Sequence, residues 1–159
     1  MDIRRAKPDD IPRIDELLRQ VGAVHADGRP DLFKHGRKYL PEDLAKFLTD
    51  ETRPVFVAAD EEGTVIAHLF CRIEETPEDA VHQACRTLYI DDLCVDEKAR
   101  RRHAARALYT FIRGWAKENG FHNITLFVWD FNTPAKRFYE AIGMQPQKIC
   151  MEEILEEEV

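Results

Sequence analysis

The stretch 93–108 constrains the fold of this chain more than any other. It begins as the end of an apolar strand, continues as a short loop rich in arginine, and ends in the first turns of a long helix. A helix start exposes unpaired backbone N–H groups and the positive end of the helix dipole. Arginine side chains beside it add charge and donors. The stretch therefore predicts a binding site for a phosphorylated ligand between a strand and a helix.

The charge of the whole chain makes this basic loop unusual. The 159 residues carry a formal net charge of −7, whereas nucleic-acid-binding proteins are usually basic. A nucleic-acid patch at residues 100–106 is therefore an alternative that the net charge argues against. The length and the hydrophobic content of 44% predict one globular domain over residues 1–159.

Apolar runs indicate where a protein is located, and the spacing of cysteines and histidines indicates whether it binds a metal. The N-terminus lacks the apolar run of a signal peptide, and no apolar run approaches the length of a membrane span. The four cysteines form no CxxC pair, and the histidines show no metal-like spacing. We expect a cytoplasmic protein with reduced thiols, no membrane partner and no metal.

Hydrophobic periodicity predicts four helices. Apolar residues at helical spacing follow Pro8 as far as Val21, and a second helical face covers 41–48. Longer helical patterns cover 104–119 and 133–142. The buried face expected for the helix 104–119 consists of Ala104, Leu108, Phe111, Ile112 and Trp115.

Strands are expected around these helices. Their predicted ranges are 3–6, 54–59, 64–73, 87–95, 123–129 and 144–154. A turn at 60–63 makes the second and third strands an antiparallel hairpin, and 74–84 is interpreted as a loop. The strand–helix–strand unit over 87–129 requires a parallel pair joined by a crossover helix. The chain therefore predicts an α+β fold, with a mixed central sheet and helices on both faces.

Two segments resemble the GCN5-related N-acetyltransferase (GNAT) superfamily. Residues 100–105 are similar to that family's Q/R-x-x-G-x-G/A pyrophosphate loop, and residues 132–144 are similar to its N-x-x-A-x-x-F-Y-x-x-x-G-F/M motif. The motifs occur in the family's order, with a strand between them. The resemblance implies the acyl-CoA N-acyltransferase fold, direct transfer of an acetyl group from acetyl-CoA to an amine, and often a homodimer.

One position departs from the family motif, because His103 stands where the family has its first glycine. That glycine lets the backbone approach the pyrophosphate closely. An imidazole there either crowds the phosphates or donates to them. Because a helix start does not by itself require a positive φ, we expect coenzyme A binding to persist. The departure also leaves open a module that senses acyl-CoA without turnover.

The resemblance assigns cofactor contacts to both motifs. Backbone groups of Leu93, Cys94 and Val95 would pair with the pantetheine arm as an added strand does. Asn132 would reach the same arm and could also cap its helix, on which Ala135 follows. The residues expected at the pyrophosphate are Arg100, Arg101, Arg102, His103, Ala104, Ala105 and Arg106.

The implied reaction needs an acid and a base. Tyr139 stands where the family often places a general acid, beside the cofactor, to protonate the leaving thiolate. A phenol with a pKa of about 10 and a thiol with a pKa of about 8.5 suit that transfer. Asp91 and Asp92, charged residues in an apolar strand, are candidates for the base. Adjacent strand residues face opposite sides, so only one reaches the acceptor unless a bulge re-aims both, and Asp92 is slightly preferred.

The acceptor is expected to be a small cationic amine or a protein amine. The strand with the two acids is similar to that of the family's polyamine and aminoglycoside branches, so Asp91 and Asp92 are also expected to bind the acceptor. Phe33 and Tyr39 lie in the loop where this family shapes its acceptor pocket. Structural roles remain alternatives: a core aromatic for Tyr139, and an exposed strand face or a turn cap for the two acids.

Overall fold

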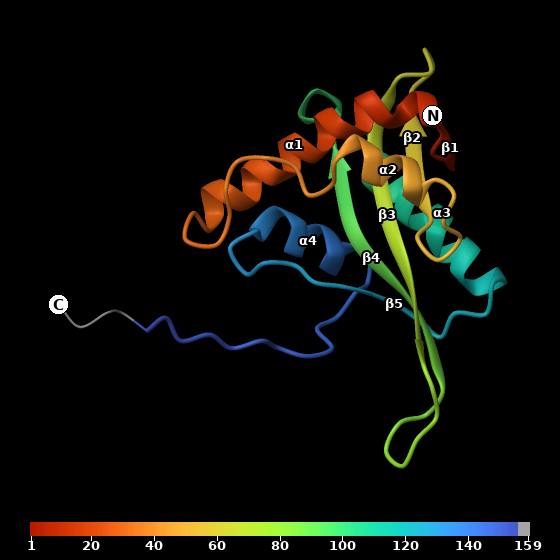
Figure 1. Cartoon of the computed structure of the whole chain (residues 1–159), viewed down its shortest axis with the longest axis vertical. Coiled ribbons are helices and arrows are strands. Elements are labelled where there is room, and N and C mark those ends of the chain that lie inside the picture. The colour runs from red at the N-terminus through yellow and green to blue at the C-terminus, as the bar shows by residue number, and fades with distance from the viewer. Residues whose placement is uncertain (156–159) are drawn as a thin grey trace. The chain divides into compact units, whose positions relative to one another are not determined.

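The computed structural model describes residues 1–155 and forms two compact units, Met1–Phe127 and Val128–Val159. Residues 156–159 lie outside the described part. The first unit holds a five-stranded sheet with α1, α2 and α3, and the second holds α4 (Thr133–Ala141), as Figure 1 shows. Among the residues described, no helix is long and apolar enough to cross a membrane.

The sheet follows chain order, from β1 at one edge to β5 at the other. Its strands are β1 (Asp2–Arg5), β2 (Val55–Ala59), β3 (Val65–Thr76), β4 (Cys85–Val95) and β5 (Asn123–Leu126). The first four pair antiparallel, whereas β5 pairs parallel to β4. The crossover helix between the parallel strands is α3 (Ala104–Glu118). The mixed sheet predicted from the sequence is therefore confirmed.

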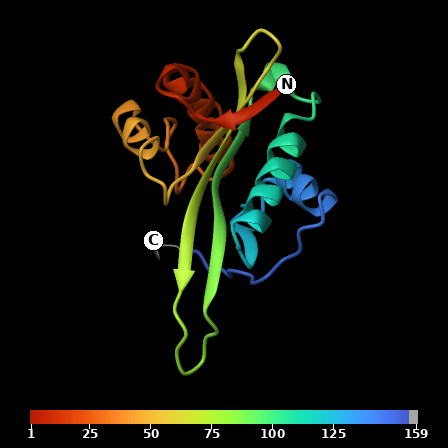
Figure 2. The same ribbon diagram turned by 90° about the vertical axis from the view of Figure 1, so that its right-hand side faces the viewer.

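Helices cover both faces of this sheet (Figure 2). α1 (Ile11–Gly28) follows a single 3-10 turn and packs with α2 (Pro41–Phe47) on one face, while α3 packs on the other. Alternate residues of β2 divide between the two cores, since Val57 packs toward α1 and Phe56 toward α3. Alternation of this kind determines which side chains of neighbouring strands lie on the same face of the sheet.

α1 is longer than its periodicity predicts, because it continues through Gly22 to Gly28. Gly22 does not end the helix; it allows close packing at this position. A Cβ added to Gly22 would lie 2.3 Å from the backbone oxygen of Gly36, in the loop that follows the helix. The absent side chain therefore lets this loop lie directly on α1.

Three predicted ranges and one predicted core position need correction. β3 extends to Thr76, inside the expected loop 74–84, and β4 begins at Cys85, earlier than predicted, so that their outer residues pair with one another. β5 ends at Leu126, and the strand expected at 144–154 is absent from the described structure, because a segment with apolar residues forms a stable strand only beside partner strands. On α3 the residue Phe111 is 39% exposed, and Ala116 belongs to the buried face instead.

Candidate functional site

A β-bulge in β4 defines the candidate site. The register between β3 and β4 shifts after Phe70, so that Asp91 is an extra residue in β4. Ile90 and Leu93, on either side of the two aspartates, both pack in the core beneath α3. The bulge therefore directs both Asp91 and Asp92 to the face that carries α1 and α2. A bulge was the condition under which both acids could reach one acceptor, and β4 has such a bulge.

Asp92 is held by a buried histidine of β3. The ring of His68 is fully buried, and its Nε2 lies 2.5 Å from Oδ2 of Asp92. Because a carboxylate oxygen accepts hydrogen bonds, Nε2 is the donor. The other ring nitrogen, Nδ1, has no hydrogen-bond partner among the residues described. The sequence prediction missed His68, although a single histidine within the apolar run 65–71 was a signal.

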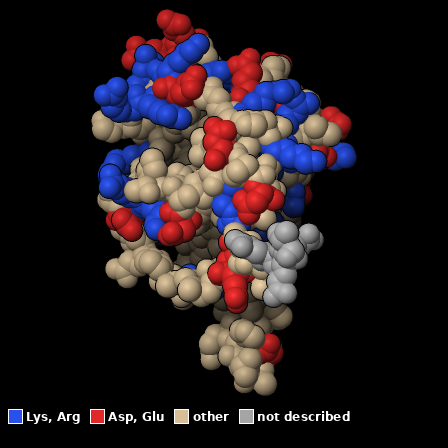
Figure 3. All heavy atoms as spheres, turned by 90° about the vertical axis from the view of Figure 1, so that its left-hand side faces the viewer, with Lys and Arg blue, Asp and Glu red and all other residues tan. Residues whose placement is uncertain are grey.

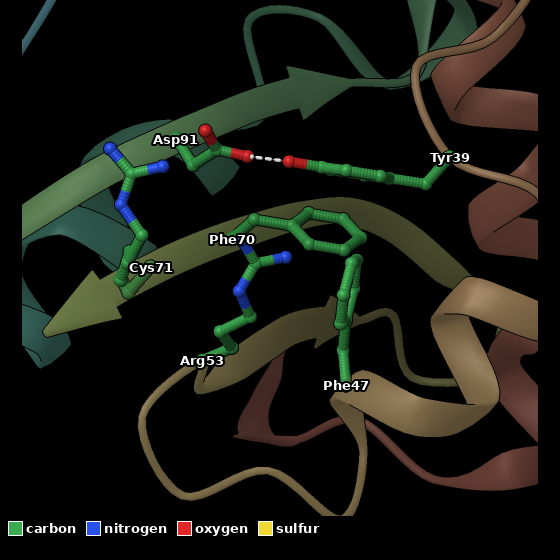
Figure 4. Close-up of a pocket in the computed structure, with 7 residues that line it drawn as sticks. Tyr39, Phe47, Arg53, Phe70, Cys71 and Asp91 are labelled. Atoms are coloured by element: carbon green, nitrogen blue, oxygen red, sulfur yellow. Dashed lines mark hydrogen bonds between the residues drawn. The ribbon is translucent and has the colours of Figure 1, made fainter.

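Asp91 is held by two residues of the loop between α1 and α2. The hydroxyl of Tyr39 donates to its carboxylate (Figure 4). The Nζ of Lys38 lies 3.0 Å from Oδ1 of the same carboxylate and donates to the backbone oxygen of Asp91, also at 3.0 Å. Burial raises the pKa of Tyr39, and the bond to Asp91 raises it further. The Tyr39 hydroxyl therefore stays a donor at physiological pH.

A small pocket with aromatic walls opens beside Asp91 (Figure 4). Its rings come from the loop, α2 and β3, and the rings of Tyr39 and Phe47 meet edge to face with their centroids 4.8 Å apart. The residues that line it are Tyr39, Phe47, Arg53, Phe70, Cys71, Arg72 and Asp91. Asp91 brings a carboxylate to the pocket, while Arg53, whose Cζ lies 4.7 Å from the centroid of the Phe47 ring, and Arg72 bring positive charge to it.

Phe33, the second residue expected at the acceptor pocket, lies with a different partner. Its ring packs on the ring of His25 in the last turn of α1, with the centroids 5.4 Å apart. Burial lowers the pKa of His25, and Lys38 acts in the same direction while Asp92 opposes it. Phe33 therefore packs on His25 and is not among the residues that line the pocket.

β4 presents a partly unpaired edge beyond the bulge. β5 pairs only with residues 87–90 of β4, so within the unit Met1–Phe127 the following residues pair with β3 alone. Leu93, Cys94 and Val95 lie on this stretch, as the resemblance implies for a pantetheine site. The Cys94 thiol donates to the backbone oxygen of Leu17 at 3.3 Å, and burial raises its pKa to about 12. An extended ligand would therefore meet backbone groups at Cys94 and not a reactive thiol.

Asp96 fixes the start of the basic loop, a role that the sequence prediction missed. Its backbone N–H donates to the oxygen of Ile66, and its carboxylate accepts bonds from Gln20, from the Lys98 amide and from Arg13. Burial alone would raise the pKa of Asp96, but these hydrogen bonds and the Arg13 charge lower it overall. The loop is therefore tied to α1 and β3 at its first residue.

The start of α3 has the features of an anion site. The side chains of Arg100, Arg101, Arg102 and Arg106 are exposed around it. His103 occupies the N-cap position, and within the described residues no side chain caps the helix. The buried Ala104 and the partly buried Ala105 put no bulky side chain at the first two positions of the helix. Its amides and the arginines together suit a diphosphate.

The backbone at His103 differs from the expectation for a helix start. His103 has φ 61° and ψ 16°, in the left-handed region, and Arg101 also has a positive φ. The expectation that this position needs no positive φ is therefore wrong. The glycine of the family motif corresponds to a position where a side chain introduces backbone strain.

Replacing His103 with glycine should raise the free energy of unfolding by about 0.5–1 kcal/mol, since relief of about 1–2 kcal/mol of strain exceeds the added entropy of the unfolded chain. Thermal denaturation without ligand measures this change, and an equal or lower stability contradicts the strain. Calorimetry with acetyl-CoA reports separately on the imidazole. Binding tightens if the ring crowds the phosphates and loosens if the ring donates to them.

The remaining predicted cofactor residues belong to the second unit. Asn132 is the N-cap of α4, and its side-chain oxygen accepts a bond from the Ala135 amide at 3.3 Å. The capping role left open for Asn132 is therefore confirmed. Tyr139 lies half-buried on α4, with its ring centroid 5.2 Å from that of Phe138. Its role as an acid stays a prediction.

Comparison with known proteins identifies the family. Residues 21–144 match the family described as Acetyltransferase (GNAT) family. A crystal structure of a single-substitution variant of the BH1408 protein from Bacillus halodurans is 33% identical, with a TM-score of 0.94 and coverage of 98% of this chain and 99% of that one. This chain therefore belongs to the GNAT acetyltransferase family and has its fold. No curated protein matches the sequence.

More distant solved structures share the fold. The aminoglycoside N-acetyltransferase AAC(6')-Iy in complex with CoA is 15% identical, with a TM-score of 0.72 over 98% of this chain and 99% of that one. The aminoglycoside acetyltransferase meta-AAC0020 from an uncultured soil metagenomic sample, in complex with sisomicin, is 23% identical, with a TM-score of 0.70 over 98% and 96%. At these identities the likeness concerns the architecture alone.

Proposed function

We propose that this protein is an N-acetyltransferase that moves an acetyl group directly from acetyl-CoA to a primary amine of a small cationic molecule or a protein. The observation that carries the proposal is the β4 bulge, which places Asp91 and Asp92 on one face, next to a strand edge whose backbone groups have no partner strand within the described part of the unit Met1–Phe127. Membership of the family supports an acyl-CoA donor. The CoA bound to the aminoglycoside acetyltransferase AAC(6')-Iy agrees with it.

Donor binding would use the backbone and the basic loop. The edge at Leu93, Cys94 and Val95 would pair with the pantetheine arm, and the first amides of α3 with the surrounding arginines would hold the diphosphate. From the second unit, Asn132 and Ala135 are proposed to contact the same cofactor. Arginine suits a diphosphate because its planar guanidinium can donate two parallel hydrogen bonds.

In the proposed reaction the acceptor nitrogen attacks the thioester carbonyl, loses a proton to a carboxylate, and coenzyme A leaves as its thiol. We assign the base to Asp92, acting directly or through water, because the Asp91 carboxylate is engaged by Lys38 and Tyr39, whereas that of Asp92 is engaged among the described residues by His68. His68 is then a positioning residue, since its Nε2 fixes one oxygen of Asp92. The proton on the leaving sulfur comes from Tyr139.

Release of the free thiol from acetyl-CoA, measured across a panel of primary amines, tests this function. We expect saturable release that depends on the amine. Tight coenzyme A binding without turnover for any acceptor would instead indicate a sensor of acyl-CoA. Absence of acetyl-CoA binding at millimolar concentration, measured by calorimetry, would overturn both readings.

Replacing Tyr139 with phenylalanine tests the proposed acid. We expect kcat to fall by about 10²-fold or more, the usual contribution of a positioned proton donor, while the affinity for acetyl-CoA changes little. Phe138 offers a matched control, because Phe138→Leu alters the neighbouring ring without removing a hydroxyl. An unchanged kcat in Tyr139→Phe would refute the role.

A nucleic-acid-binding function receives no support from the charge distribution. The chain is acidic overall, and on the face drawn in Figure 3 acidic and basic side chains are interspersed. The homodimer and the cytoplasmic location expected from the sequence stay predictions.

A further inference from the structure

The side chain of Lys38 ends at the carboxylate that the proposed function places in the acceptor site. We infer that Lys38 is an internal stand-in for the acceptor, whose own alkylammonium group binds Asp91 and the ring of Tyr39 by displacing it. The inference rests on the proposed function only in that it identifies the displacing amine as the acceptor of the acetyl group. The ammonium site itself is defined by contacts and can be tested without turnover.

Three groups surround the Lys38 ammonium. Its Nζ lies 3.0 Å from Oδ1 of Asp91 and donates to the backbone oxygen of the same residue at 3.0 Å. The same nitrogen lies 5.4 Å from the centroid of the Tyr39 ring. A carboxylate, a carbonyl and an aromatic face are the three partners that a primary ammonium prefers. The bulge matters here because it turns Asp91 toward the loop.

The loop holds the neighbours of Lys38 firmly and leaves its side chain movable. Nε of Arg37 lies 3.0 Å from Oδ1 of Asp15 on α1, and the Tyr39 ring packs against two other rings. Gly36 lies against Gly22. Between these anchors the Lys38 side chain is 45% exposed. It can therefore rotate out into solvent while the loop backbone stays in place.

The chemistry of the site restricts what can replace Lys38. The displaced group is a primary ammonium on an unbranched methylene chain, so the acceptor class is an aliphatic primary amine. Arg53 and Arg72 also line the pocket, and their charges disfavour a second cation there. The ammonium is therefore placed at Asp91 itself. Because the Lys38 end of the ion pair is exposed to solvent, the pair is weak, and the resident lysine should reduce the affinity for an incoming ammonium by only about fivefold.

Calorimetry with 1,5-diaminopentane as the probe, on the full chain without acetyl-CoA, tests this inference. Lys38→Met keeps the length of the side chain and removes its ammonium. We expect the variant to bind the probe about fivefold more tightly than the unaltered protein. Asp91→Asn should lose this binding, and 1,5-pentanediol, which has no ammonium, should not bind either protein.

Lys46→Met is the matched control, because Lys46 is an exposed lysine on α2 that lies 3.9 Å from Asp43. It should leave probe binding unchanged. Equal affinity in Lys38→Met and the unaltered protein, equal tightening in both lysine variants, or no heat from any of them would overturn the inference. Tighter probe binding in Lys38→Met without acetylation of any amine would instead contradict the proposed function and leave the ammonium site standing.

Discussion

Replacing Gly22 with alanine is expected to lower the free energy of unfolding by about 2 kcal/mol. Alanine is the better helix former by about 1 kcal/mol. Its Cβ would lie 2.3 Å from the backbone oxygen of Gly36, however, and an overpacked contact of this kind costs about 3 kcal/mol. The displaced loop carries Lys38 and Tyr39, so acceptor affinity should fall more than acetyl-CoA affinity. Denaturant unfolding and KM for each substrate measure the two effects.

Gly114→Ala supplies the control within the same protein. Gly114 lies in the interior of α3, and nothing lies within 4 Å of a Cβ built on it. Only helix propensity acts at this position, so the substitution should stabilise the protein by about 1 kcal/mol. If both alanine variants are stabilised, the contact between α1 and the loop does not constrain the fold.

Asp92→Asn is expected to lower kcat by about 10²- to 10⁴-fold, the range over which a positioned base contributes. Asparagine has almost the same volume and can still accept a bond from His68, so the fold should survive. Acetyl-CoA affinity should change little, because the basic loop and the β4 edge are left intact. Steady-state kinetics with a responsive amine, together with calorimetry of acetyl-CoA binding, measure both quantities.

Asp91→Asn is the matching variant, because the two aspartates are neighbours on one bulge. We expect it to raise KM for the amine with a smaller effect on kcat, since Asp91 binds an ammonium in our assignment. Loss of kcat in Asp91→Asn, with Asp92→Asn unaffected, would exchange the two roles. Unchanged kinetics in both variants would remove the carboxylates from the mechanism.

Much of the fold could be predicted from local patterns. The periodicity of α3 follows from burial on one side of the helix, and the apolar run of β2 follows from burial on both faces of the sheet, and the sequence carries both directly. The extension of α1 could not be predicted, because the reason for Gly22 lies in a loop fourteen residues away. The last strand was wrong because the apolar residues of 144–154 favour burial but do not supply a partner strand.

The candidate site was predictable where a residue type has one common role in its sequence context. The arginine loop and the two acids of β4 stood out against their surroundings. His68 did not, because a histidine in an apolar strand is equally consistent with an ordinary core position. The partners of Asp91 depend on loop packing, and the left-handed φ of His103 depends on how the loop enters α3. Neither the loop packing nor the backbone conformation of His103 produces a periodic pattern in the sequence.

The β4 bulge also has an evolutionary consequence. Because Asp91 is the extra residue, loss of its single codon would pair Ile90 and Asp92 with successive residues of β3 and restore regular alternation. Neither hydrophobic core would change sides. A lineage could therefore gain or lose one negative charge at this position through a one-codon insertion or deletion, which gives the family a simple route to diverge in the charge of its acceptors.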